Sequence, residues 1–344
     1  MRKNHFLTKV KAACLWGMAA LTLPLATACS SDTQDGDPGY LARDMFIVEV
    51  EEGVNVFFQN NGDGTVLVSY DLTNPMHMTE KGASVLTDYV GEINIPATIT
   101  VEGTTYRVVG VKECAFMNNT TLTKVTLPAG ISSIGKMAFK NCLNLKSVNI
   151  PEGVDEIPDY CFQGDTTLTT VVMPQHLNRI GTNAFMKCTK IEAMHIPEGV
   201  GEIPNYCFQD CKALRVIQLP DGVTALADSA FLNCSALKYV GMPEKLESLG
   251  VGTFAGCRSL IEVTLPESVK TIGENCFSSI DSKTGDSNWN KLTLNVMSTV
   301  PPTLTGSITN ARTRKRLVIP RGYLEAYEAN PYWAEFDEIL ERNY

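Results

Sequence analysis

Residues 168–188 read LTTVVMPQHLNRIGTNAFMKC, and the same spacing of apolar residues, proline and phenylalanine returns every 23 residues. Phenylalanine keeps one register at eight positions: Phe116, Phe139, Phe162, Phe185, Phe208, Phe231, Phe254 and Phe277. Proline keeps the same interval at seven positions: Pro128, Pro151, Pro174, Pro197, Pro220, Pro243 and Pro266. This unbroken repeat predicts a solenoid, because one short unit cannot bury its apolar side whereas stacked units share a continuous core.

Each unit carries the pattern L-x-x-V-x-L-P, which in the quoted unit begins at Leu168. Alternation of the last two apolar positions predicts a short strand with one buried face, and the proline ends it because proline has no backbone donor. A second apolar column follows the proline: Ile134, Ile157, Ile180, Ile203, Leu226, Leu249 and Ile272. We therefore expect one strand per unit, with the strands stacked in a parallel sheet.

These units resemble the BspA-type bacterial leucine-rich repeats, whose pattern is L-x-x-V-x-L-P-x-x-V-x-x-I-G-x-x-A-F-x-x-C. The quoted unit keeps four family residues: Gly181, Ala184, Phe185 and Cys188. The preceding unit departs from the pattern at Pro158 and Cys161, and the resemblance as a whole is close over 92–281. It implies a β-rich leucine-rich-repeat solenoid, a right-handed curved superhelix with a parallel sheet and short helical turns, capped at both ends.

The start of the chain predicts an export signal. Residues 1–28 hold no acid and four basic residues, Arg2, Lys3, Lys9 and Lys11, and then an uncharged apolar run. Ala26-Thr27-Ala28 before Cys29 resembles the lipobox of bacterial lipoproteins, although Ala26 stands where leucine is usual. We expect 1–28 to be a signal peptide and Cys29 to carry lipid. The alternative is an uncleaved anchor, since the charge-free run from Ala12 to Ser31 is about long enough to span a bilayer.

The flanks of the array predict a tether and two caps. Residues 29–41 are small, polar and acidic, which indicates a flexible tether. Acidic residues at this place also resemble a surface-export signal of the Bacteroidetes, and a plain solvated linker remains the alternative. Residues 42–110 show short alternating segments and a hairpin signal at 60–64, so we expect an antiparallel β cap with a loop inserted near 101–106.

The array is expected to span 111–281, followed by a repeat remnant and a helical cap over 282–344. Trp333, Phe336 and Ile339 belong to the aromatic and apolar face of that predicted helical segment. At three-residue spacing on a helix, Trp333 and Phe336 more often seal a core than form a binding platform. We therefore interpret both residues as part of the cap.

Motifs for chemistry are sparse. The chain has 29 Lys and Arg against 38 Asp and Glu, a net charge of −9, which argues against a nucleic-acid binder. Its four histidines form neither H-x-x-x-H nor H-E-x-x-H, and the sequence holds no G-x-S-x-G motif and no phosphate loop. We therefore expect no metal, no cofactor and no catalytic activity.

The cysteines follow the repeat and predict packing rather than chemistry. Five share the column three residues after phenylalanine: Cys142, Cys188, Cys211, Cys234 and Cys257. Three more precede a phenylalanine directly, where other units have alanine or threonine: Cys161, Cys207 and Cys276. Such interchange indicates a site for small side chains, so we expect free buried thiols. Adjacent units about 5 Å apart would also permit disulfides by distance, which leaves that alternative open.

The outward positions of the strands are the candidate binding surface. In the central units they are Val172, His195, Val216, Gln218 and Tyr239. Sheet faces of solenoids often bind partners, and this mixture suits a protein or a glycan; an ordinary β face with scattered apolar residues is the alternative. The family resemblance implies adhesion to host matrix proteins such as fibronectin or fibrinogen.

We therefore hypothesise an exported lipoprotein of the outer membrane or cell surface. It would be held by its lipid and would bind an extracellular or host protein or glycan without catalysis. The alternatives are a glycan-degrading accessory enzyme and a purely structural envelope protein. A glycosidase needs two carboxylates about 5 to 9.5 Å apart, whereas Glu262 is the one acid in the outward columns, which speaks against such a site there.

Overall fold

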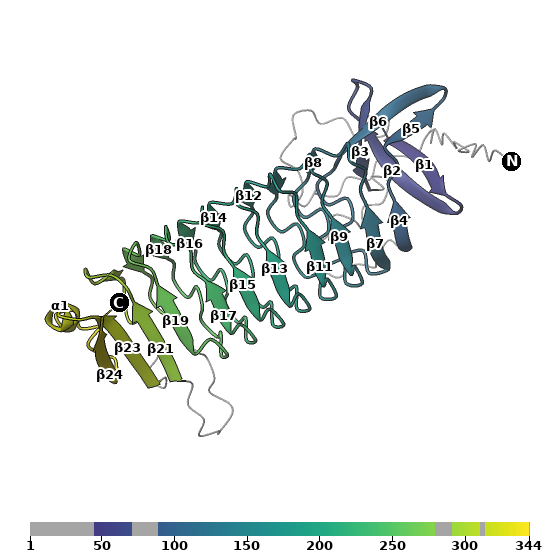
Figure 1. Ribbon diagram of the computed structural model, residues 1–344. Helices are drawn as coiled ribbons and strands as arrows, with labels where there is room; N and C mark the ends of the chain where they lie inside the picture. The colour runs from purple at the N-terminus through teal and green to yellow at the C-terminus, as the bar shows by residue number, and fades with distance from the viewer. Residues whose placement is uncertain (1–44, 71–88, 279–290, 310–313, 344) are drawn as a thin grey trace, which may run out of the picture.

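The computed structural model describes residues 45–70, 89–278, 291–309 and 314–343. The predicted signal peptide, the tether and Cys29 lie outside these ranges. The described chain is an elongated stack of repeats, with the N-terminal strands at one end and the C-terminal segment at the other (Figure 1). This confirms the predicted β-rich solenoid. Within the described ranges, no helix has the length and apolar character needed to cross a bilayer.

The predicted strand of each unit forms, and successive strands pair in parallel. The first sheet holds β4 (Gly91–Asn94), β7 (Leu122–Thr126), β9 (Ser147–Asn149) and β11 (Thr170–Val172). The second holds β13 (Ala193–His195), β15 (Val216–Gln218) and β17 (Tyr239–Gly241). The third holds β19 (Glu262–Leu265), β21 (Lys291–Val296), β23 (Arg314–Pro320) and β24 (Glu338–Arg342). We call the outward side of these three sheets the strand face.

The second apolar column forms a ladder of two-residue strands. Its members are β8 (Ser133–Ile134), β10 (Glu156–Ile157), β12 (Arg179–Ile180), β14 (Glu202–Ile203), β16 (Ala225–Leu226), β18 (Ser248–Leu249), β20 (Thr271–Ile272) and β22 (Thr303–Leu304). Pairing is continuous from β14 to β22, whereas β10 pairs only with β12, so the ladder breaks at two joints.

Two prolines explain these breaks. Where the ladder is intact, the residue after the second-column position donates its N–H to the preceding unit, as Gly181 N does to Ile157 O at 2.7 Å. Pro158 and Pro204 occupy this position at the joints β8/β10 and β12/β14. Proline has no N–H, so the connecting bond cannot form. The departure of Pro158 from the family pattern therefore has a direct structural consequence.

The phenylalanine column is the spine of the core. All eight rings stack in order, with adjacent centroids 5.1 to 5.7 Å apart and planes within 12° of parallel. Seven of the rings are essentially inaccessible to solvent, and Phe277 at the end of the series is 6% exposed. The predicted internal stack is confirmed.

The phenylalanine of each unit lies in a tight turn. These turns stand where short helical turns were expected. In the quoted unit Asn183 and Lys187, two residues on either side of Phe185, have φ of 59° and 64°. Positive φ disfavours most side chains, and this explains why asparagine and glycine recur there, as at Asn141 and Gly164. Among the described residues the one α-helix is α1 (Leu324–Glu328), outside the array.

The N-terminal cap is a mixed sheet. β1 (Met45–Glu51), β2 (Val54–Asn60) and β3 (Thr65–Ser69) are antiparallel, and the predicted hairpin joins β2 to β3. β6 (Thr104–Val111) pairs in parallel with β3 and with β8, and so connects the cap to the array. The expected loop near 101–106 is instead a hairpin between β5 (Thr98–Val101) and β6. Its turn residues Glu102 and Gly103 both have positive φ, as the twist of a two-residue hairpin requires.

The C-terminal cap combines one short helix with a strand. Trp333 is fully buried and Phe336 is 7% exposed, so their role in sealing the core is confirmed. They do not lie on the expected helix: Trp333 lies in a turn after α1, Phe336 follows that turn, and Ile339 lies on β24. Hydrogen bonds across the cap replace helical packing, since Trp333 Nε1 donates to Pro302 O at 3.1 Å and β24 pairs with β23.

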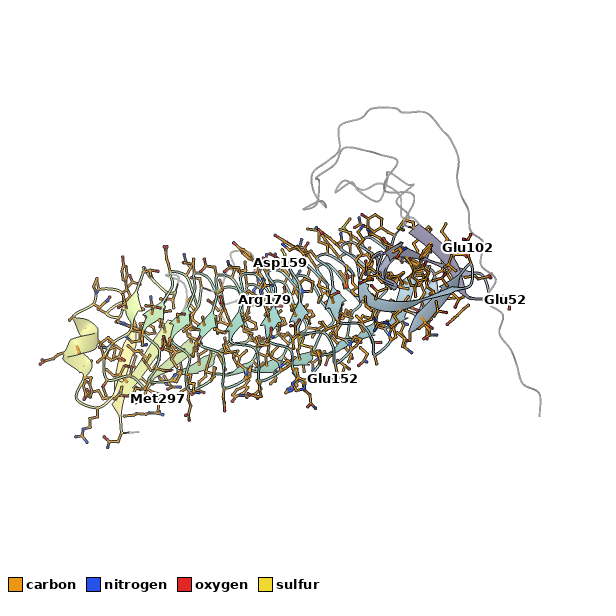
Figure 2. All side chains as sticks on the ribbon, turned by 90° about the horizontal axis from the view of Figure 1, so that it is seen from above. Glu52, Glu102, Glu152, Asp159, Arg179 and Met297 are labelled. Carbon is orange, nitrogen blue, oxygen red and sulfur yellow. The ribbon has the colours of Figure 1, made fainter. Side chains whose placement is uncertain are left out.

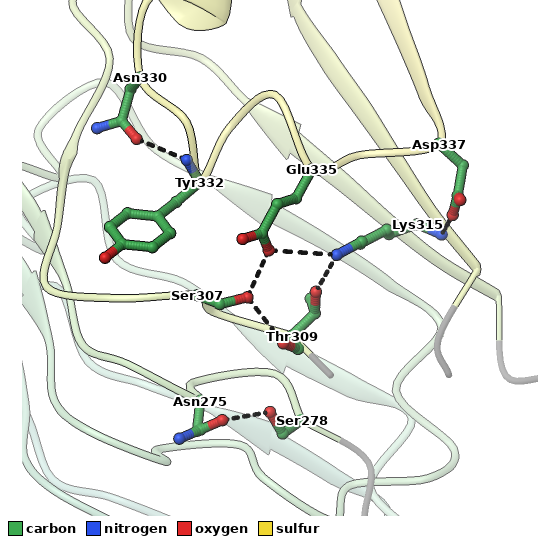
Figure 3. Close-up of polar contacts among 9 residues, drawn as sticks. All are labelled: Asn275, Ser278, Ser307, Thr309, Lys315, Asn330, Tyr332, Glu335 and Asp337. Carbon is green, nitrogen blue, oxygen red and sulfur yellow. Dashed lines mark hydrogen bonds and ion pairs between the residues drawn. The ribbon is translucent and has the colours of Figure 1, made fainter. Parts of the chain in front are cut away.

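A polar cluster closes one side of this cap (Figure 3). The Lys315 side chain is largely buried, and its Nζ donates to Thr309 Oγ1 at 2.9 Å and lies 3.6 Å from Glu335 Oε2. Ser307 Oγ donates to the same carboxylate oxygen at 2.6 Å, and Lys315 N donates to Asp337 Oδ2 at 2.7 Å. The buried ammonium is therefore compensated by a carboxylate and a hydroxyl, as buried charges require.

Candidate binding surface

The five predicted residues are all exposed on the strand face. Tyr239 is 56% exposed, Val172 53% and Val216 47%, and His195 and Gln218 are exposed as well. Alternation along each strand explains this, because the intervening Met194, Ile217 and Val240 are buried in the core. Their predicted orientation is confirmed, and binding at these residues stays a prediction.

Four of the five residues share one sheet. On β13, β15 and β17 the register pairs Val216 with Tyr239 and His195 with Gln218. Two adjacent rows result. Val216 and Tyr239 form the aromatic row, and His195 and Gln218 form the polar row. Val172 occupies the equivalent position one unit before His195, but it lies on β11, whose sheet is not paired with β13. The predicted surface therefore crosses a boundary between two sheets. We call its four-residue part on β13, β15 and β17 the central patch.

Gly241 shapes the central patch beside Tyr239. It is paired with Gln218 in the polar row and has no side chain, and the Gln218 carboxamide fills the space that a Cβ at Gly241 would occupy. Gln218 Nε2 donates to Leu219 O at a long 3.3 Å, so the amide is weakly held. The sequence contained the signal, since glycine in a strand often marks a close approach by a neighbour.

The central patch contains no Asp, Glu, Lys or Arg, and charged residues flank it. The residues directly before β13, β15 and β17 are Glu192, Arg215 and Lys238, and Arg215 Nη2 lies 3.9 Å from Glu192 Oε1. Both side chains of that pair are more than half exposed, so the pair contributes little to stability. On β19 the Glu262 carboxylate accepts a hydrogen bond from Asn295 Nδ2 at 3.0 Å. The strand face thus offers an apolar and amide surface with a charged rim.

Some acids elsewhere along the array are paired with cations. Near the two-residue strands, Arg179 forms ion pairs with Glu156 and Asp159, and Lys136 Nζ lies 3.3 Å from Asp159 Oδ2. Asp159 and Arg179 lie side by side midway along the array (Figure 2). Over the described ranges, no three His, Cys, Asp or Glu side chains gather as a metal site would require.

The side chains of both cysteine columns are packed in the core. The nine cysteines within the described ranges are free thiols and all are buried. Sequence analysis missed their second role: Cys188 Sγ donates to Phe162 O, 26 residues earlier, at 3.1 Å. The same bond recurs at 3.0 to 3.2 Å from four others: Cys142, Cys211, Cys234 and Cys257. Burial raises the pKa of Cys188 and Cys211 well above the ordinary value, so these thiols are not poised to react.

Comparison with known proteins agrees with the repeat architecture. A family model described as "BspA type Leucine rich repeat region" matches residues 90–215 and 178–292, with six copies. No curated protein sequence matches the chain.

Solved structures that are similar to the chain include two leucine-rich repeat proteins. One is a leucine-rich repeat protein from Bacteroides ovatus ATCC 8483, at 21% identity and a TM-score of 0.57, with 83% of this chain and 75% of that chain covered. The other is a leucine-rich repeat protein from T. pallidum, at 30% identity and a TM-score of 0.50, with 59% and 86% covered. The first supports the fold alone, and the second also supports a relationship within the repeats.

Proposed function

The chain belongs to the BspA-type leucine-rich repeat family, and from this premise we propose that it is an exported lipoprotein that binds an extracellular or host protein or glycan without catalysis. The central patch, with Val172 beside it, is the proposed contact surface. The patch is the observation on which this proposal rests, because it places an exposed tyrosine, a valine and two polar side chains on a rigid sheet.

The physical case for binding rests on rigidity and on Tyr239. Each strand of the patch is paired on the sheet and anchored below by buried residues, so little conformational freedom is lost when a partner binds. Tyrosine offers a large amphipathic ring with two rotatable side-chain angles, and such residues often dominate interface energies. A patch without acids, lysines or arginines inside a charged rim also matches the usual anatomy of interfaces.

Export and lipidation are supported by the sequence of residues 1–29. Removal of 1–28 would lower the net charge from −9 to −13, because it takes away four basic residues and no acid. Incorporation of a radiolabelled fatty acid by cells that express the full chain would test the lipid anchor. Cys29→Ala should abolish labelling and leave the signal attached. Labelling that persists in the Cys29→Ala variant, or a purified wild-type chain that keeps residues 1–28, would favour the uncleaved anchor.

Binding is tested with immobilised fibronectin, immobilised fibrinogen and a glycan array. Tyr239→Ala should weaken binding to whichever probe the wild-type chain retains by about 1 to 2 kcal/mol, roughly 5- to 30-fold. Tyr206→Ala is the matched control, because Tyr206 is 40% exposed but lies in the turn before Phe208, away from the strand face. Equal affinity of both variants and wild type would remove the central patch from the proposal. Release of reducing sugar ends that one Asp or Glu substitution abolishes would instead establish the enzyme alternative.

A further inference from the structure

Asp165 is an acid in a column that five other units fill with cysteine. It stands three residues after Phe162, and its side chain is completely buried. Its unit carries β9, and β11, the last strand of the first sheet, follows Asp165 at the start of the next unit. A buried carboxyl group at this joint needs an explanation, because an unpaired carboxylate in an apolar interior is strongly unfavourable.

This column offers its side chains two hydrogen-bonding roles, donation to a backbone carbonyl and acceptance of a backbone N–H. The first role is that of a hydrogen-bond donor for the backbone carbonyl of the phenylalanine in the preceding unit. The thiols fill it, as Cys188 Sγ does by donating to Phe162 O. Asn119 fills this role with an amide, since its Nδ2 donates at 2.9 Å to the carbonyl of Tyr89, whose ring packs against Phe116 at a tilt of 55°. Two unrelated groups thus deliver a hydrogen to the same acceptor position.

The second role is that of an acceptor. Cys142 N donates to Asp165 Oδ1 at 2.7 Å, so this oxygen accepts the column's hydrogen bond. Asp165 Oδ2 is also buried and has no partner. The corresponding carbonyl is that of Phe139, 26 residues before Asp165, which receives Cys142 N at 3.1 Å and retains a second lone pair. A carboxylate has no hydrogen to donate there, whereas a carboxylic acid has one.

We propose that Asp165 is a neutral carboxylic acid in the folded protein, with its proton on Oδ2 serving the Phe139 carbonyl, so that the joint between two repeats is coupled to proton binding. The acid then acts as the column's thiols do, with one acceptor and one donor. Loss of the proton would leave a buried anion that faces a carbonyl oxygen, and the joint would open to hydrate it.

The surroundings of Asp165 agree with the neutral form. The titratable groups that face it are the thiols of Cys142, Cys161 and Cys188, and burial raises the pKa of each, which keeps them uncharged. No ion pair involves Asp165 within the described ranges. Burial raises the pKa of the Asp165 carboxyl well above its ordinary value, and the Cys142 N–H only partly opposes this.

The sign of the pH effect follows from this shift. The unfolded chain releases the Asp165 proton near its ordinary pKa of about 4, whereas the folded chain keeps it to higher pH. Stability from this group is therefore complete below about pH 4 and is lost as the pH rises towards the raised value. In that interval each pH unit multiplies the unfolding equilibrium constant by about ten.

The test compares the full chain with Asp165→Asn in urea titrations between pH 4.5 and 8.5. Asparagine keeps a donor and an acceptor but cannot ionise, so the ratio of wild-type to variant unfolding constants should rise about tenfold per pH unit until the folded carboxyl titrates. Asp221→Asn, an exposed acid beside a turn, is the matched control and should follow wild type. A constant ratio over the whole range would overturn the proposal.

A direct reading of the proton does not depend on unfolding. At pH 7 the wild-type chain should show an infrared band of one protonated carboxyl group, and Asp165→Cys, which restores the column residue, should lack that band. Absence of the band from folded wild type would overturn the proposal even if Asp165→Asn failed to fold.

Discussion

The two sides of each repeat are built to different rules. On the phenylalanine side every joint is closed, since each phenylalanine N–H from Phe116 to Phe277 donates to the following unit at 2.7 to 3.0 Å and the rings stack without a gap. On the strand side the strands fall into three separate sheets. The outward positions there also change chemistry from Lys124 through Val216 to Glu262. The turn side therefore carries the frame, which leaves the outward positions of the strand face free to vary.

The largest effect should come from the frame. Phe185→Ala removes a ring stacked between neighbours at 5.4 and 5.6 Å, and should lower the free energy of unfolding by about 3 to 5 kcal/mol. Val216→Ala on the strand face should change it by less than about 0.5 kcal/mol. Urea titrations followed by circular dichroism measure both. Similar losses for the two variants would break the comparison.

The next effect concerns access to thiols. Burial raises the pKa of Cys276 to about 12, which lowers its thiolate fraction roughly a thousandfold relative to an ordinary thiol. Iodoacetamide at pH 8 should therefore leave Cys276 unmodified in the folded chain, whereas a cysteine introduced by Val216→Cys should react within minutes. Peptide mass spectrometry separates the two sites. Rapid modification of Cys276 without denaturant would show that the turn side opens.

A smaller effect should come from the ladder of two-residue strands, which already contains prolines. Ala227→Pro removes the bond from Ala227 N to Ile203 O, 2.9 Å long, at the position that Pro158 and Pro204 hold in other units. One lost hydrogen bond and the lower entropy of the unfolded chain partly offset each other, so the cost should be at most about 1 kcal/mol. A measured cost above about 2 kcal/mol would show that this ladder is part of the frame.

The smallest effect on stability should be at Gly241. Gly241→Ala places a methyl group where the Gln218 carboxamide lies, and this flexible side chain can swing away, so the unfolding free energy should change by less than about 0.5 kcal/mol. Binding should nevertheless respond, because Gln218 belongs to the proposed contact surface. Unchanged affinity for a probe that depends on Tyr239 would restrict the contact to the aromatic row.

Much of this structure was predictable because residues at the same position of successive repeats become neighbours in space. Val216 and Tyr239 pair because both hold the same place in units 23 residues apart, and alternation decided which side chains face outward. The burial of the phenylalanine and cysteine columns followed in the same way. Trp333 was correctly expected in the core, but the helix assigned to it was wrong, since the strand β24 forms only by pairing with β23.

The sequence by itself determined the period, the columns, the buried faces and the outward residues, because each depends on local alternation repeated along the chain. The tertiary structure alone decided the left-handed turns around Phe185, the hydrogen bond from Cys188 to Phe162 and the boundary between β11 and β13. These features depend on which backbone atoms of neighbouring units meet, and residue type does not encode that directly. Asp165 shows the difference most clearly: the sequence displays an acid in a cysteine column, and only the burial of its Oδ2 without a hydrogen-bond partner led us to propose that it carries a proton.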